Sequence, residues 1–221
     1  MTLQDAILNR HSVRAYKDEP IEKNIAERLN EFIIECNKES GLNIQLVLNE
    51  PKAFDCFMAH YGKFKCVKNY IAIVANDNKS LYEKIGYYGE KIVLFAQTLG
   101  LNTCWVALTY KKIKGVISVK KGQKLHVVIS LGYGQTQGNV RKSKNIYDVC
   151  DKKEYPEWFI NGVKSALLAP TAINQQKFYF NLNDNKVTAK AKPGPYSKLD
   201  LGIVKYHFEI GANTENFSWG K

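Results

Sequence analysis

The stretch that most constrains the fold of this chain is YYGEKIVLFAQTLGLNTCWV, residues 87–106. Between Glu90 and Gln97 almost every position is apolar, so a helix here would have hardly any polar face. Gly100 stands where a helix end favours a left-handed residue, and the apolar run 101–106 then predicts a strand or tight turn. The segment is long enough to span a bilayer, but its charged and amide side chains favour a buried helix at the centre of a domain.

Shorter patterned segments surround this helix. Apolar residues at helical spacing predict further helices over residues 3–8, 21–36, 53–59 and 158–168. Apolar runs bounded by turn residues predict strands over residues 44–48, 67–75, 125–131 and 178–182. The section 183–198 is rich in turn residues and predicts a hairpin or exposed loop.

A weak internal repeat follows residue 150. The order helix, loop, strand, helix recurs there, and the segment 201–210 is similar to 88–97. We therefore expect two related halves in one chain, residues 1–150 and a shortened half at 151–221.

The cysteines argue against a disulfide framework or a zinc site. The chain has five, an odd number, and none forms a CxxC pair. The first nine residues also lack the apolar core of a signal peptide. These features predict a cytoplasmic protein with reduced thiols.

The net charge of +11 raises the possibility of nucleic-acid binding. Most of the 32 basic residues are lysines scattered among acids, whereas phosphate and base recognition favours clustered arginine. Three of the four arginines, Arg10, Arg14 and Arg141, lie in two short segments. Their placement favours planar recognition of one anion over a general nucleic-acid surface.

The first of these segments is RHSVRAY, residues 10–16. In an extended chain Arg10, Ser12 and Arg14 point to one face and present two guanidinium groups beside a hydroxyl. This set suits a phosphate, although a solvated basic turn after a helix is the alternative.

The second polar segment is APTAINQQ, residues 169–176. Pro170 ends the preceding helix, and the side chains of Thr171, Asn174 and the two glutamines offer uncharged donors and acceptors. Such groups can bind the edge of a planar heterocycle, or they can form an ordinary polar loop at a helix end.

Together these segments resemble the FMN-dependent nitroreductase family. RHSVRAY is similar to the RxSxRxY/F opening motif, and residues 88–106 resemble the long core helix followed by GLxxxW. LGYG at 131–134, with Arg141 and Lys142, resembles the closing strand and basic phosphate contact. APTAINQQ resembles the (S/A)PSxxNxQP loop, but it lies in the second half of this chain instead of after the first helix.

The resemblance implies an α+β nitroreductase-like fold, with a mixed, mainly antiparallel sheet packed with helices around a buried central helix. In the family, FMN binds at a homodimer interface. A chain with both motifs in separate halves resembles the subgroup with an internal duplication. It implies a monomeric pseudo-dimer or a weak homodimer with one flavin site per chain.

The resemblance also implies roles for individual residues. The FMN phosphate and ribityl chain would be held by Arg10, Ser12, Arg141 and Lys142, with His11 beside them. Arg14 would lie at the pyrimidine end, where positive charge suits a reduced flavin. Backbone amides at Val106, Ala107 and Leu108 would contact flavin N5. The isoalloxazine edge would be covered by Pro170, Thr171, Ala172, Asn174 and Gln176, with Gln175 nearby.

The implied activity is hydride transfer from NAD(P)H through flavin N5 to a nitroaromatic, quinone or similar small-molecule acceptor. This chemistry needs no protein nucleophile and no metal, and the sequence has no pattern for either. We expect no nucleic-acid or membrane partner. A non-catalytic or regulatory flavin-binding protein of the same fold is the alternative.

Overall fold

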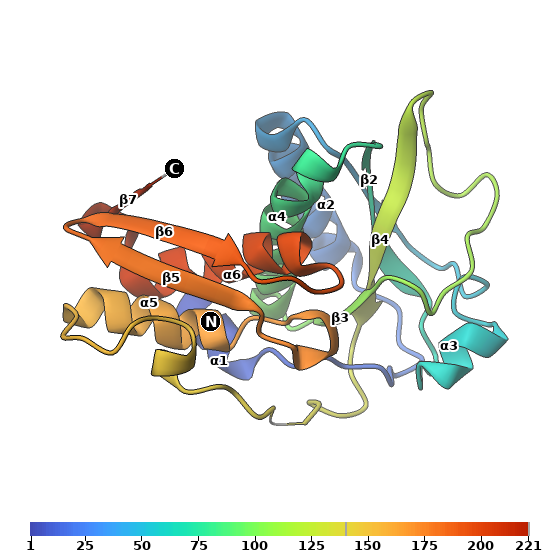
Figure 1. Cartoon of the computed structure of the whole chain (residues 1–221). Helices are drawn as coiled ribbons and strands as arrows, with labels where there is room; N and C mark the ends of the chain where they lie inside the picture. The colour runs from blue at the N-terminus through green and yellow to red at the C-terminus, as the bar shows by residue number, and fades with distance from the viewer. Residues whose placement is uncertain (140, 221) are drawn as a thin grey trace. The chain divides into compact units, whose positions relative to one another are not determined.

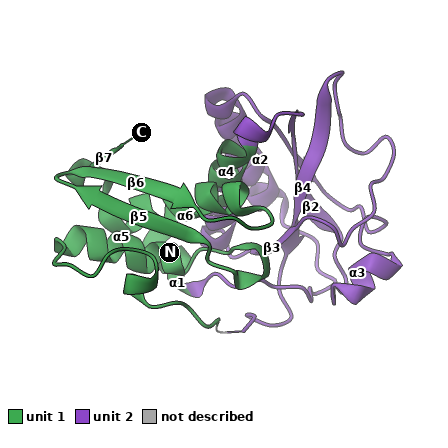
Figure 2. Ribbon diagram, in the orientation of Figure 1, with its two compact units in different colours: residues 1–8, 82–91, 141–221 green, residues 9–81, 92–140 purple. Residues whose placement is uncertain are grey.

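The computed structural model describes residues 1–139 and 141–220, which form two compact units (Figures 1 and 2). Unit 1 comprises residues 1–8, 82–91 and 141–221, and unit 2 comprises residues 9–81 and 92–140. The last segment of unit 1 begins at residue 141, whereas the predicted first half of the chain ends at residue 150. The relation between the two halves stays a prediction.

Unit 2 is built on a four-stranded antiparallel sheet of order β1-β2-β4-β3. Its strands are β1 (Asn43–Val47), β2 (Asn69–Asn76), β3 (Asn102–Val106) and β4 (Gln123–Gly132). The continuous apolar sequence of β2 fits its position between two neighbours, because seven of its eight residues are buried. Helix α2 (Lys23–Ser40) contacts β1 and extends four residues beyond the predicted 21–36, to a left-handed cap at Gly41 (φ 71°).

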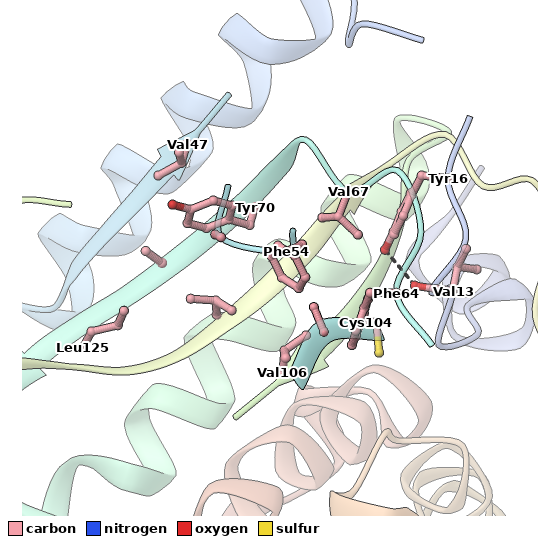
Figure 3. Packing of buried hydrophobic residues seen from close by; sticks show 14 of the residues in the cluster. Val13, Tyr16, Val47, Phe54, Phe64, Val67, Tyr70, Cys104, Val106 and Leu125 are labelled. Atoms are coloured by element: carbon pink, nitrogen blue, oxygen red, sulfur yellow. Dashed lines mark hydrogen bonds between the residues drawn. The ribbon is translucent and has the colours of Figure 1, made fainter. Parts of the chain in front are cut away.

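One hydrophobic cluster of unit 2 packs around Tyr70, Ala72 and Val74, which lie on one face of β2 (Figure 3). Phe54 packs edge-on against Phe64, with ring centroids 5.2 Å apart, and also contacts Tyr70. The buried Tyr16 hydroxyl donates to the carbonyl of Val13 at 2.7 Å. This core therefore joins the opening segment of the chain to the sheet.

The expected central helix is α4 (Tyr82–Thr98), and its apolar middle is fully buried, from Ile92 to Leu94 and again at Ala96. Its Leu99 cap is followed by Gly100 with φ 82°, so the helix ends where the sequence predicts. Residues up to Lys91 belong to unit 1 and those from Ile92 to unit 2.

Unit 1 combines helices with a three-stranded sheet. Its helices are α1 (Leu3–Asn9), α5 (Glu157–Leu167) and α6 (Ser197–Ala212), and its strands are β5 (Phe178–Asn183), β6 (Lys186–Ala191) and β7 (Ser218–Trp219). The last residue of α1, Asn9, belongs to unit 2. Strands β5 and β6 form an antiparallel hairpin, while β7 pairs with β6 in parallel. Phe208 of α6 stacks on Phe180 of β5 at 4.7 Å and meets Phe159 of α5 edge-on. Aromatic packing thus joins both helices to the hairpin.

The structure confirms an α+β fold, with six α-helices and two mainly antiparallel sheets in the described residues. The section 183–198, expected as a hairpin or exposed loop, contains the turn and second strand of a hairpin whose first strand is β5. The predicted bounds of one helix, 53–59, are wrong: α3 spans Phe57–Tyr61. Ala53 and Phe54 instead form a turn, in which the Ala53 amide donates to the Glu50 carboxylate and the Phe54 amide donates to the Pro51 carbonyl. No helix of the described residues combines the length and apolarity needed to cross a membrane.

Candidate functional site

The opening segment of unit 2 lies beside β3 in an extended conformation. Ser12 forms a parallel bridge with Thr103, and the Val13 amide donates to the Thr103 carbonyl at 3.0 Å. Val13 is fully buried in the core, whereas Ser12 is partly exposed. The alternation in the sequence therefore places core residues and polar residues on opposite sides of this segment.

Three polar side chains of the segment influence the pKa of the buried Cys104 thiol. Burial raises the pKa of Cys104, and the positive charges of Arg14 and Arg10 and a hydrogen bond with Ser12 oppose that rise. Arg10 is only 1% exposed, while Arg14 is exposed and lies 6.0 Å from the Phe64 ring centre. Arg10, Ser12 and Arg14 therefore all lie near enough to Cys104 to influence its ionisation.

The glycine-rich loop after β4 runs along the same segment. The Lys17 amide donates to Tyr133 at 2.8 Å, and the Gln135 amide donates to Ala15 at 2.9 Å. Gly138 has φ 79°, and a Cβ there would lie 2.6 Å from the His11 Cβ. Only glycine fits this close approach without strain, so the loop and His11 line one region of unit 2.

The proposed flavin N5 contact lies just beyond β3. Val106 is the last, buried residue of the strand, and Ala107 is partly exposed. Leu108 is 69% exposed. The chain here has left the sheet ladder, so the amides of Ala107 and Leu108 are not used by strand pairing.

In unit 1, the loop after α5 has an unusual backbone. It contains a 3₁₀ turn, Ala172–Asn174, in which Ile173 has φ 47° and Asn174 has φ 55°, and Gln176 has φ 46°. Left-handed geometry is costly for a β-branched residue such as Ile173, which is also 89% exposed. Strain of this kind persists only where surrounding contacts impose it, and it is common at ligand sites.

Side-chain amides of the loop fix its path. Gln176 is 2% exposed, donates to the Leu167 carbonyl at 2.9 Å and accepts from the Lys144 amide at 2.8 Å. The Asn174 amide donates to the Lys142 carbonyl at 2.8 Å. The loop and the segment 141–144 are thus joined, which brings the partly buried Arg141 and the exposed Lys142 to the same part of unit 1.

One functional candidate of this loop was missed in the sequence. Asp200, in the first turn of α6, accepts from the Ala172 amide at 3.1 and 3.2 Å and from the Gln175 side chain at 2.7 Å. It is 4% exposed, and burial raises its pKa to about 6 against the effect of those hydrogen bonds. In the sequence, its position between the apolar Leu199 and Leu201 was the signal that could have indicated a buried acid. An acidic residue in the first turn is also common on exposed helices, so this signal does not distinguish a buried acid from an exposed one.

The chemistry of these residues fits FMN. Guanidinium, hydroxyl and imidazole groups with a glycine loop, in unit 2, suit a phosphate ester. The loop of unit 1 offers amide groups suited to an uncharged heterocycle, and the buried Oε1 atom of Gln175 receives no hydrogen bond from the described residues. No group of three or more His, Cys, Asp or Glu among the described residues could hold a metal ion.

The chain is similar in fold to several solved structures. A "putative nitroreductase" of Thermotoga maritima is 23% identical with a TM-score of 0.70, over 96% of this chain and 83% of that chain. A "putative nitroreductase" of Desulfovibrio desulfuricans in complex with FMN is 15% identical with a TM-score of 0.54, over 71% and 99%. A mutant FMN- and NADPH-dependent nitroreductase of Sphigopyxis sp. is 13% identical with a TM-score of 0.56, over 70% and 100%.

At these identities the solved structures show a shared fold. None of the curated proteins compared with the chain matches it. The family model described as "Putative TM nitroreductase" matches residues 2–212, nearly the whole chain. The protein is therefore a member of this nitroreductase family.

Proposed function

We propose that the protein is an FMN-dependent oxidoreductase that uses NAD(P)H to reduce a nitroaromatic, quinone or similar small acceptor. The observation that supports the proposal is the position of Arg10, Ser12 and Arg14 near the Cys104 thiol, with the Gly138 loop against His11. Membership in a nitroreductase family supports it.

The proposed contacts follow from the donors that each unit offers. In unit 2, Arg10 and Ser12 would bind the phosphate and ribityl chain, and Arg14 would place positive charge at the pyrimidine ring. The backbone amides of Ala107 and Leu108, which lie beyond the paired residues of β3, would donate to flavin N5. When bound, FMN supplies the centre that accepts hydride and passes it on.

Unit 1 would contribute the remaining contacts. Arg141 and Lys142 add positive charge for the phosphate. The loop from Pro170 to Gln176 would lie over the ring edge, with its backbone held by Asn174 and Gln176. We further propose that a single chain supplies both sets of contacts, so that a monomer or weak homodimer binds one flavin per chain.

The experiment that tests this function follows the flavin absorbance. FMN added to the purified protein should bind without a covalent bond, bleach when NADH or NADPH is added without oxygen, and recover with an electron-poor acceptor. Donor and acceptor that use one slot in turn should give parallel double-reciprocal lines. Absence of FMN binding contradicts the proposal, and FMN binding without reduction by either nicotinamide favours a non-catalytic flavin protein instead.

A further inference from the structure

The carboxylate of Asp200 contacts the loop 171–176 at two points. It accepts the Ala172 backbone amide and the Gln175 side-chain amide, and Gln175 also donates to the Pro195 carbonyl at 2.7 Å. The two left-handed residues Ile173 and Asn174 lie between these points. One carboxylate therefore holds both ends of the most strained part of the loop.

The surroundings of Asp200 make these bonds its principal polar contacts. Among the described residues no cation forms an ion pair with it. From the neighbouring segments, the Lys144 ammonium bonds to the Gln175 and Gln176 carbonyls at 3.1 and 2.8 Å, and Lys177 lies against the position of Gly194. From α4, which approaches α6 closely, Glu83 bonds to Lys205.

We propose that Asp200 is a positioning residue of the flavin site, which fixes the left-handed pair Ile173 and Asn174 by holding Ala172 and Gln175. The identity of the ligand rests on the proposed function, but the effect of Asp200 on the loop does not. Without this acceptor, the loop loses its bonds to the first turn of α6, which oppose relaxation of the two residues toward ordinary backbone angles.

The ionisation of Asp200 gives the inference a specific pH signature. Burial raises its pKa to about 6, so the charged form is the less favourable one when the loop is closed. Opening the loop to water would lower that pKa toward the ordinary value for aspartate. Linkage then requires loop opening to become easier as the pH rises through about 6, and the group's contribution to global stability to fall over the same range.

Amide hydrogen exchange on the apoprotein tests the positioning role directly. Asp200→Asn should speed exchange at residues 172–176 by about tenfold, because the asparagine amide presents N–H groups where the loop already offers two donors. In the wild type, loop opening should increase from pH 5 to pH 7 beyond the intrinsic base-catalysed rise, and in Asp200→Asn this excess should vanish. Asp184→Asn, the same change at the exposed β5–β6 turn, is the control and should alter neither.

A second variant keeps the test decisive if Asp200→Asn does not fold. Gln175→Met removes the 2.7 Å donor while keeping the side-chain length, and it should also loosen the loop. In the double variant, Gln175→Met should increase loop exchange by less than it does alone, because the hydrogen bond between Gln175 and Asp200 is already lost in Asp200→Asn. Unchanged loop exchange in both single variants would overturn the positioning role.

Binding of FMN provides a separate readout. Asp200→Asn should raise the FMN dissociation constant by about tenfold at pH 7, because the loosened loop must be ordered when the ligand binds. If the wild type binds FMN and Asp200→Asn binds it equally well with unchanged exchange, the positioning role fails while the function stands. If the wild type binds no FMN, the proposed function fails, and loop exchange alone decides the role of Asp200.

Discussion

At the scale of single residues, Arg10 is the most informative position of the opening segment. Its side chain is buried, and its positive charge acts to lower the pKa of the Cys104 thiol, against the effect of burial. Arg10→Ala should weaken FMN binding by about 1.5–3 kcal/mol, because a charge-assisted contact with phosphate would be lost. Titration of the apoprotein with FMN, followed by flavin fluorescence, measures the change.

The matched control for this prediction is Arg28→Ala. Arg28 is the one arginine outside the motif segments and is exposed on α2, so its loss should leave the FMN dissociation constant unchanged. Equal weakening by both variants would indicate a general effect of charge, and unchanged affinity in Arg10→Ala would remove Arg10 from the site.

At the scale of elements, the crossing of α4 and α6 inside unit 1 depends on two glycines. A Cβ at Gly86 would lie 1.9 Å from the Leu199 carbonyl oxygen, and one at Gly202 would lie 1.8 Å from the Glu83 carbonyl oxygen. Both neighbours are backbone atoms, so the helices must separate to admit a methyl group. Gly202→Ala should therefore destabilise the protein by about 1–3 kcal/mol despite the better helix propensity of alanine. Urea unfolding followed by circular dichroism measures the change.

Gly62→Ala serves as the control at this scale. Gly62 has φ −70°, and the three atoms nearest to an added Cβ are side-chain atoms of Thr109 and Phe64 at 2.9–3.0 Å, which can shift more easily than backbone. Its effect should stay below about 1 kcal/mol. A Gly202→Ala protein as stable as the wild type would show that the two helices do not need this close approach.

At the scale of the whole molecule, the question is whether one chain completes its own flavin site. The opening motif and the APTAINQQ loop occur in the same chain but in different units. If one chain supplies both, Arg10→Ala and Asn174→Ala proteins should each bind FMN poorly, and mixing them should restore nothing. Titration of the mixture with FMN, with size-exclusion chromatography of the wild type, measures the outcome.

Restored binding at about one site per mutant pair would instead show that the loop serves a neighbouring chain. An obligate dimer burying on the order of 2,000 Å² or more would then be expected.

Much of the fold follows from local patterns in the sequence. Periodicity along the chain underlies the apolar run of α4, the continuous strand β2 and the alternation of Arg10, Ser12 and Arg14. The end of α4 depends on the backbone preference of one residue, Gly100. These signals lie within a few residues of one another. The sequence could therefore place most of the helices and strands.

Only the tertiary structure decided which polar residues became buried partners. The sequence marks Glu90 merely as a polar residue of an apolar helix, yet it is fully buried and lies 2.8 Å from His207, 117 residues away. Asp200 likewise became an acceptor for Ala172 and Gln175 only because the α5 loop returns to α6. Burial of a charge depends on which segments meet across long separations, and local periodicity carries no information about those meetings.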